Sequence, residues 1–255
     1  MDEVKNKLYD YLKQYPRVAV AFSGGVDSSY LLYAAKDAGC DVRAYYINSQ
    51  FQPKFELEDA QRLAESIGAS LTIGSVDALS DPNIWSNPND RCYHCKNAVF
   101  SKIWELARAD GISVLFDGTN ADDDESDRAG MVALRELEVV SPLRECGLTK
   151  SDIRRFSLEA GLFTHDKPSY ACLATRIPTG TDITEQDLER VEITEDLLFK
   201  MGFTDFRIRL IPPNDAKLQI HATQWVQAAE MREDILSALS QHYDNVLLDL
   251  NPRYT

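Results

Sequence analysis

Short apolar runs alternate with amphipathic segments along the first two thirds of the chain. Five runs have the length of a buried strand, at residues 17–22, 41–48, 70–76, 113–118 and 138–143. The segments that follow four of them place apolar residues three and four positions apart, as helices do, over residues 27–39, 53–68, 97–111 and 149–161. This alternation predicts an α/β fold, in which a parallel sheet carries helices on both faces.

The pattern changes near residue 165. A helix predicted over 184–202 is followed by two adjacent strands, at 205–211 and 216–222, without a helix between them. A helix over 223–243 and a strand over 245–250 complete the chain. Adjacent strands predict antiparallel pairing, so we expect two domains: residues 1–165 as the parallel α/β domain and residues 166–255 as a small α+β domain.

Composition narrows the class of protein. The chain has 255 residues, of which 44% are hydrophobic, and a formal net charge of -14. Binding to a nucleic-acid backbone needs clustered Lys and Arg, so this charge predicts no nucleic-acid partner. No apolar run is long enough to span a bilayer, and the charged N-terminus lacks the apolar stretch of a signal peptide. We therefore expect a cytoplasmic protein with no membrane partner.

A glycine-containing motif joins the first predicted strand to the first predicted helix. Gly24 and Gly25 allow a tight turn whose N–H groups can approach an anion, and the start of the helix favours negative charge. The Gly-Lys-Ser/Thr ending of a Walker A loop is absent, as is Gly-x-Gly-x-x-Gly. An acidic residue inside such a loop, Asp27, implies Mg²⁺ between it and a phosphate. The hydroxyl donors are Ser23, Ser28 and Ser29. The alternative is an ordinary glycine-rich turn.

The cysteines indicate metal binding or catalysis. Five cysteines are an odd number, which disfavours a purely structural disulfide framework. Cys92 and Cys95 form a Cys-x-x-Cys pair, and Cys172 lies in "SYACLATRIP". Zinc held by these three residues, with His94 as a fourth ligand, is one interpretation; a redox disulfide of the pair is another. We expect Cys40 in the core and Cys146 in a loop, both inert.

The motif "SGGVDSS" resembles the Ser-Gly-Gly-x-Asp-Ser signature of the PP-loop ATP pyrophosphatases, which have the Rossmann-like adenine nucleotide alpha-hydrolase fold. The resemblance implies that ATP is bound through its β- and γ-phosphates, that a nucleophile attacks the α-phosphate, and that pyrophosphate leaves. The segment "DGTNADD" resembles a second motif of these enzymes, near the nucleotide and Mg²⁺. It implies ATP contacts from Gly118, Thr119 and Asn120, and a second Mg²⁺ carboxylate among residues 122–124, with Asp123 preferred. An Asp-rich surface turn is the alternative.

The cysteine motifs together with "DFRIR" resemble the LarE family, which inserts sulfur during synthesis of the nickel-pincer nucleotide cofactor. The resemblance covers nearly the whole chain. It implies that ATP adenylates a carboxylate of pyridinium-3,5-biscarboxylic acid mononucleotide, and that the catalytic residues include Cys172 and Asp27. We add Lys96 as a catalytic candidate, because it directly follows the cysteine pair and could contact the substrate or the ATP phosphates. The resemblance also implies a homo-oligomer, with a hexamer as the family's form.

The family has two branches, which differ in their source of sulfur. In one, the cysteine that matches Cys172 gives up its own sulfur, and the Cys-x-x-Cys pair is absent. This chain has the pair, so it resembles the branch in which Cys92, Cys95 and Cys172 hold a 4Fe-4S cluster. Three thiolates leave one iron free to carry an extra sulfide. Zinc remains the rival metal.

Basic side chains provide candidates for substrate binding. Lys96 directly follows the cysteine pair, and Arg176 lies in the Cys172 motif. Arg207 and Arg209 are two positions apart on a predicted strand, so they share a face and could bind a phosphate or carboxylate. A solvated charged face is the alternative.

Two other functions compete with sulfur insertion into a small nucleotide. The first is thiolation of tRNA by a PP-loop enzyme, which predicts a basic surface and an RNA-binding domain. The second is a zinc-bearing ATP-binding protein without sulfur transfer.

Overall fold

The chain forms two compact units in the computed structural model, which describes residues 2–123 and 128–253. The first unit comprises Met1–Ala78 and Asp90–Lys167, and the second comprises Leu79–Asn89 and Pro168–Thr255. The main division therefore falls two residues beyond the predicted boundary at 165. The membership of Leu79–Asn89 in the second unit had no counterpart in the sequence analysis.

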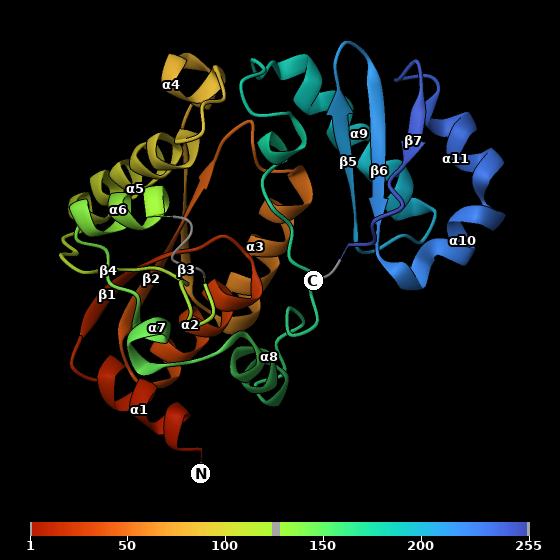
Figure 1. The fold of residues 1–255 in the computed structure, drawn as a ribbon. Helices are drawn as coiled ribbons and strands as arrows, with labels where there is room; N and C mark the ends of the chain where they lie inside the picture. Colours follow the sequence, from red (N-terminus) through yellow and green to blue (C-terminus); the bar gives the residue numbers. More distant parts are fainter. Residues whose placement is uncertain (1, 124–127, 254–255) are drawn as a thin grey trace. The chain divides into compact units, whose positions relative to one another are not determined.

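The first unit contains a four-stranded parallel sheet, as predicted (Figure 1). Its strands are arranged in the order β3-β2-β1-β4, with β1 at Arg17–Ala21, β2 at Asp41–Asn48, β3 at Ser70–Ser75 and β4 at Leu115–Phe116. The fifth strand expected over 138–143 is wrong. Val140 makes one isolated bridge to Phe116, and Pro142 then begins helix α7 (Pro142–Cys146). The strand cannot continue through Pro142, because proline has no N–H to donate to a strand ladder.

Helices cover both faces of this sheet (Figure 1). Val18 and Val20 of β1 belong to one buried cluster, and Ala19 between them belongs to another, because successive strand residues point to opposite faces. The first cluster includes residues of α1 (Glu3–Leu12), α2 (Val26–Asp37), α3 (Lys54–Ile67) and α8 (Lys150–Glu159). The second includes residues of α5 (Arg91–Ala109), against which α6 (Arg128–Glu136) packs.

Helix α5 begins earlier than the sequence predicted. Its first residue is Arg91 instead of residue 97. The Cys-x-x-Cys pair therefore lies in the first turns of a helix and not in a loop, which fixes the directions of both thiols. None of the helices that the structure describes is long and apolar enough to cross a membrane.

The second unit is built on a three-stranded sheet in the order β5-β6-β7. The strands β5 (Phe206–Ile211) and β6 (Asp215–Ile220) are antiparallel, as predicted, and β7 (Val246–Leu248) runs parallel to β6. Helix α9 is Glu185–Lys200. The single helix expected over 223–243 is divided at Met231 into α10 (Trp225–Glu230) and α11 (Arg232–Leu239).

A short helix from the middle of the chain completes the second unit. This helix, α4 (Pro82–Trp85), is followed by Asn87. The Asn87 amide donates to the carbonyls of Ile177 and Pro178, at 3.3 and 2.9 Å, and the Ile183 N–H donates to the Trp85 carbonyl at 2.7 Å. Three single-turn helices, at Ala78–Ser80, Leu173–Arg176 and Ala222–Gln224, account for the remaining regular structure among the described residues.

Candidate functional site

The glycine motif forms the turn between β1 and α2. Gly24 has φ +71°, and a Cβ there would lie 3.2 Å from the Glu56 carbonyl oxygen and 3.3 Å from Ala60 Cβ. Glycine is required both for the left-handed backbone and for the close approach of α3. Gly25 is the N-cap of α2, and no hydrogen bond from a described side chain caps that helix. The first N–H groups of α2 are thus arranged as in an anion site.

Serine hydroxyls brace this turn from inside. The Ser23 N–H donates to Ser28 Oγ at 3.2 Å, and the Gly25 N–H donates to Ser23 Oγ at 3.3 Å. The Ser29 hydroxyl donates to the Gly25 carbonyl at 2.6 Å, and its side chain is fully buried. Ser29 was predicted to bind ATP; its geometry supports a role in holding the loop.

The second motif lies against the first. A Cβ on Gly118 would lie 2.9 Å from the backbone nitrogen of Ser28, so only glycine lets the two segments meet. Asp117 is buried and accepts hydrogen bonds from Ser141 Oγ, at 2.6 Å, and from Thr119 Oγ1. Burial raises the pKa of Asp117, while the two hydroxyl donors oppose that shift.

The two acidic residues predicted to bind Mg²⁺ both contact Asn120. Its N–H donates to an Asp123 carboxylate oxygen at 2.8 Å, and its side-chain amide donates to Asp27 Oδ1 at 3.4 Å. Asp122, another candidate, accepts a hydrogen bond from the Lys150 N–H at 2.7 Å. Asp124 lies outside the described residues. Among the described residues, no group of three or more His, Cys, Asp or Glu side chains is arranged to hold a metal.

Two lysines that the sequence analysis did not identify lie at the glycine motif. Lys150 Nζ is 2.5 Å from Asp27 Oδ2, and Lys167 Nζ donates to the Gly24 carbonyl at 3.3 Å and to Asp59 at 2.7 Å. Lys150 is the first residue of α8, which packs on α2. No local sequence signal marks these lysines, because only the packing of distant segments brings them to the loop.

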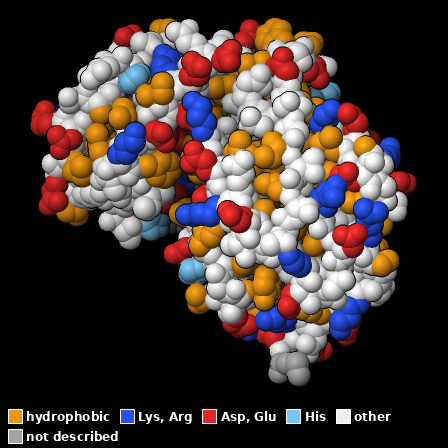
Figure 2. Space-filling model, turned by 180° about the vertical axis from the view of Figure 1, so that it is seen from behind, with side chains coloured by type: hydrophobic (Ala, Val, Ile, Leu, Met, Phe, Trp, Pro, Cys, Tyr) orange, Lys and Arg blue, Asp and Glu red, His pale blue; other side chains and the backbone are white. Residues whose placement is uncertain are grey.

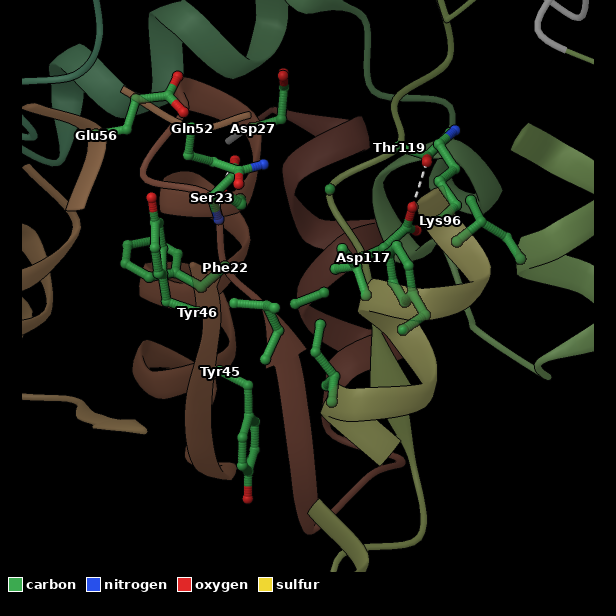
Figure 3. Close-up of a pocket in the computed structure, with 18 of the residues that line it drawn as sticks. Phe22, Ser23, Asp27, Tyr45, Tyr46, Gln52, Glu56, Lys96, Asp117 and Thr119 are labelled. Atoms are coloured by element: carbon green, nitrogen blue, oxygen red, sulfur yellow. Dashed lines mark hydrogen bonds between the residues drawn. The ribbon is translucent and has the colours of Figure 1, made fainter. Parts of the chain in front are cut away.

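A pocket of about 340 Å³ opens beside the two motifs (Figure 3). Ser23, Asp27, Gly118, Thr119 and Asp123 line it. Its other walls come from β1, β2, α3, α5 and α6 and from the segments after β1 and before α3. These residues include Ala21, Phe22, Tyr45, Tyr46, Ile47, Gln52, Glu56, Lys96, Val99, Phe100, Ile103 and Leu134. The structure thus brings Lys96 to the same pocket as the predicted phosphate loop.

The cysteine pair continues the pocket-lining face of α5. Helix positions three, four and seven residues apart share a face, and Lys96, Val99 and Ile103 have this spacing. Cys92 lies four residues before Lys96, so it extends the same face toward the N-terminus of the helix. Cys92 is exposed and Cys95 is half-buried.

The other cysteines divide into two kinds. Cys172 is half-buried and belongs to the second unit, where it precedes the single-turn helix Leu173–Arg176. Cys40 and Cys146 are buried, but Cys146 is the last residue of α7 and does not lie in the predicted loop. Burial raises the pKa of both thiols, which keeps them protonated. None of these cysteines forms a disulfide.

An arginine cluster, defined as Arg176, Arg207 and Arg209, lies in the second unit around Glu195. Arg176 makes two parallel bonds to the Glu195 carboxylate, at 2.9 and 2.8 Å, and both side chains are almost fully buried. Its remaining terminal nitrogen donates to the Ala171 carbonyl at 2.7 Å. This geometry favours a supporting role for Arg176 over the predicted substrate contact.

The other two members of the cluster lack such a carboxylate partner in the described structure. Arg207 donates to the carbonyls of Phe206 and Ser169, and Arg209 to Gln219 and the Thr175 carbonyl. Burial, followed by the neighbouring guanidinium of Arg176, lowers the pKa of Arg207 to about 10 and lowers that of Arg209. Cations crowded in this way favour an anion beside them.

Comparison with known proteins agrees with the fold. Residues 16–77 match the family model described as the tRNA methyl transferase HUP domain. The chain is 26% identical to a tRNA-specific 2-thiouridylase of Pseudothermotoga lettingae, over 59% of this chain and 54% of that protein.

Two relatives match over most of their length. An uncharacterized protein of Synechocystis is 33% identical over 95% of this chain and 92% of its own. The pyridinium-3,5-bisthiocarboxylic acid mononucleotide synthase of Lactiplantibacillus plantarum is 34% identical, over 80% of this chain and 75% of the synthase. Together with the phosphate loop at the end of β1, this similarity shows that the chain belongs to the LarE family of PP-loop, ATP-dependent sulfurtransferases.

Proposed function

We propose that this chain uses ATP to activate a carboxylate of pyridinium-3,5-biscarboxylic acid mononucleotide and replaces a carboxylate oxygen with sulfur. The carboxylate oxygen attacks the α-phosphorus of ATP, so that pyrophosphate leaves and an acyl-adenylate forms. A sulfur nucleophile then attacks the acyl carbon, AMP leaves, and a thiocarboxylate results. The observation that carries the proposal is that the two nucleotide motifs line one pocket. The chain is also similar to a pyridinium-3,5-bisthiocarboxylic acid mononucleotide synthase.

The triphosphate would lie over the turn between β1 and α2. The N–H groups of Gly24 and of the first turn of α2 would donate to the β- and γ-phosphates. Asp27 and Asp123 would hold Mg²⁺ through carboxylate oxygens, as this ion prefers, with the phosphates supplying further oxygens. In the structure the charge of Asp27 is balanced by Lys150 at 2.5 Å, which supports a cation at this position.

Lys96 would act at the α-phosphate of ATP, where the carboxylate attacks. It lines the pocket from α5, one turn from Cys92. A fixed cation stabilises negative charge as it develops on the leaving group. Lys96 is therefore placed to favour both the loss of pyrophosphate and the later loss of AMP.

The exposures of the cysteines fit a cluster held by Cys92, Cys95 and Cys172. Cys92 is exposed and the other two residues are half-buried, whereas Cys40 and Cys146 are buried with raised pKa values. Thiolates are the ligands that iron–sulfur clusters require. A bound 4Fe-4S cluster would supply sulfide from a renewable source, so that Cys172 keeps its own sulfur.

The mononucleotide would be recognised through its phosphate. Arg207 and Arg209 of the arginine cluster have lowered pKa values because of burial and nearby cations. A phosphate would relieve that repulsion and accept charge-assisted hydrogen bonds. Arg176, paired with Glu195, would position the strand and the Cys172 segment, because it also donates to the carbonyl of Cys172 at 3.3 Å.

The surface favours this small substrate over tRNA. The chain has 27 Lys and Arg against 41 Asp and Glu. On the face drawn in Figure 2, Lys and Arg side chains are interspersed with Asp and Glu and form no continuous basic area. A tRNA backbone would need such an area.

Pyrophosphate release tests the proposal. ATP, Mg²⁺ and pyridinium-3,5-biscarboxylic acid mononucleotide should release pyrophosphate with the wild-type protein, and Asp27→Ala should lower the rate by roughly 10²–10³-fold, as expected when one electrostatic stabiliser is lost. Asp10→Ala, an exposed carboxylate on α1, is the matched control and should keep the wild-type rate. Substrate-dependent release that survives in Asp27→Ala would contradict the assignment.

Metal analysis after anaerobic reconstitution tests the cysteine assignment. Ser substitutions of Cys92, Cys95 and Cys172 should each lose most of the iron, whereas Cys40→Ala and Cys146→Ala should retain it. Zinc without iron in the wild-type protein would favour the rival metal.

A further inference from the structure

The nucleotide pocket contains a buried tyrosine hydroxyl that no described residue satisfies. Tyr46 lies on β2 and is 1% exposed. Within the described part of the chain, its hydroxyl has no hydrogen-bond partner. Buried hydroxyls are nearly always paired, so an unpaired one that lines a pocket indicates a group supplied by a ligand.

The neighbours of Tyr46 show what kind of group fits. Tyr46, Gln52 and Glu56 line the same pocket, and Figure 3 shows the Tyr46 hydroxyl pointing toward the end where the other two lie. The Gln52 side-chain oxygen accepts from the Ser49 N–H and hydroxyl, at 3.1 and 2.6 Å. Its amide nitrogen is therefore the group left for the pocket, and it points inward in Figure 3.

The Glu56 carboxylate disfavours a phosphate directly beside the Tyr46 hydroxyl. Burial and then the Glu56 carboxylate raise the pKa of Tyr46, so its hydroxyl stays protonated and can donate. A carboxylate whose charge acts on the hydroxyl in this way also repels a phosphate, but it accepts hydrogen bonds from an uncharged hydroxyl. Figure 3 shows Ser23 and Asp27 of the phosphate loop on the same side of the pocket as Gln52 and Glu56. The Tyr46 hydroxyl therefore lies next to the proposed triphosphate site, where the uncharged ribose of ATP follows the phosphates.

We propose that Tyr46 recognises the ribose of ATP, by donating a hydrogen bond to a ribose hydroxyl whose own hydrogen is directed to the Glu56 side. The inference rests on the proposed function, because it takes ATP as the occupant of this pocket. It assigns sugar recognition to a side chain of β2, separate from the phosphate loop. The chemistry on both sides agrees, since a ribose hydroxyl accepts from one partner and donates to another.

Tyr30 provides a matched control within the same protein. It is also fully buried, its hydroxyl also lacks a partner among the described residues, and both tyrosines belong to the same hydrophobic cluster. Tyr30 lies on α2 and is not among the residues that line the pocket. Tyr30→Phe and Tyr46→Phe therefore remove the same atom from similar surroundings, but only the second removes it from the pocket.

Calorimetric titration with Mg²⁺ and four probes tests the inference: ATP, 2′-deoxy-ATP, 3′-deoxy-ATP and inorganic pyrophosphate. Tyr46→Phe should weaken ATP binding by roughly 3- to 10-fold, the usual effect of one hydrogen bond, and leave pyrophosphate binding unchanged. One of the deoxy nucleotides should bind equally well to the wild type and Tyr46→Phe. Tyr30→Phe should bind all four probes as the wild type does.

Several outcomes would overturn the inference. These are unchanged ATP affinity in Tyr46→Phe, an equal loss of pyrophosphate affinity, or a loss that persists with both deoxy nucleotides. The wild-type arm needs no variant: if ATP and both deoxy nucleotides bind with one affinity, no ribose contact exists. A wild-type protein that binds no ATP would instead refute the proposed function, and the inference with it.

Discussion

The nucleotide pocket of the first unit and the arginine cluster of the second unit both gather charged groups, but they satisfy those groups differently. In the pocket, Asp27 is held by a lysine that is one third exposed, and the loop presents backbone N–H groups. In the arginine cluster, Arg176 and Glu195 are paired away from water. The partly exposed pair of Asp27 and Lys150 can separate to bind a ligand with little loss of folding free energy. Removing either member of the buried pair of Arg176 and Glu195 would destabilise the second unit.

The largest expected effect is on the stability of the second unit. Glu195 accepts from Arg176, from the Tyr170 hydroxyl and from the Ile208 N–H. Glu195→Gln leaves a buried guanidinium without its countercharge, which should lower the free energy of unfolding by about 3–5 kcal/mol. Chemical denaturation measures this, with Glu189→Gln, an exposed position on the same helix, expected to stay within about 0.5 kcal/mol of wild type. Equal stability of both variants would show that the buried pair is not what holds this region.

The next effect separates substrate binding from nucleotide binding. Arg209→Gln removes a cation proposed to bind the substrate phosphate, so the KM for the pyridinium mononucleotide should rise roughly 10- to 100-fold, as for a charge-assisted hydrogen bond. The KM for ATP should not change, because ATP is assigned to the other unit. Arg232→Gln, at an exposed position on α11, is the control. A rise in the KM for ATP, without a rise in the KM for the pyridinium mononucleotide, would show that Arg209 contributes to nucleotide binding and not to substrate binding.

The smallest effect concerns the lysine on Asp27. Lys150→Ala should raise the KM for ATP roughly 3- to 10-fold, while stability changes by less than about 1 kcal/mol, because the pair is partly exposed. Lys5→Ala removes a similarly exposed lysine, paired with Glu159 at 3.2 Å in the same unit, and should leave the ATP KM unchanged. If both variants raise the KM for ATP equally, the effect comes from the loss of one positive charge and not from the position of Lys150 beside Asp27.

The same contrast explains what the sequence could predict. The two nucleotide motifs were predictable because their function depends on backbone geometry, which Gly24 in the first and Gly118 in the second reveal through the absence of side chains. Strand β2 was also predictable, since Asp41–Asn48 is an apolar run of strand length. Lys150 and Glu195 were missed because their partners lie far away in sequence, and each looks like an ordinary charged residue of a helix.

The errors in secondary structure have similar causes. The start of α5 was placed too late, at residue 97, although the helical spacing extends back through Cys92. The strand expected over 138–143 failed because Pro142 cannot join a ladder. In both cases the prediction followed the side-chain pattern of a segment and neglected the backbone requirements of the residues in or beside it.

Mass spectrometry tests most directly the central claim, that the chain inserts sulfur from a renewable source. The anaerobically reconstituted protein is allowed to react with ATP, Mg²⁺, sulfide and pyridinium-3,5-biscarboxylic acid mononucleotide, and the masses of the substrate and the polypeptide are then measured. We expect more than one thiocarboxylate per protein chain, one AMP and one pyrophosphate for each sulfur inserted, and an unchanged polypeptide mass. Pyrophosphate release without any thiocarboxylate would contradict sulfur insertion. A single turnover, with Cys172 converted to dehydroalanine, would show that the chain spends its own cysteine and that the Cys92 and Cys95 pair is not part of a renewable sulfur source.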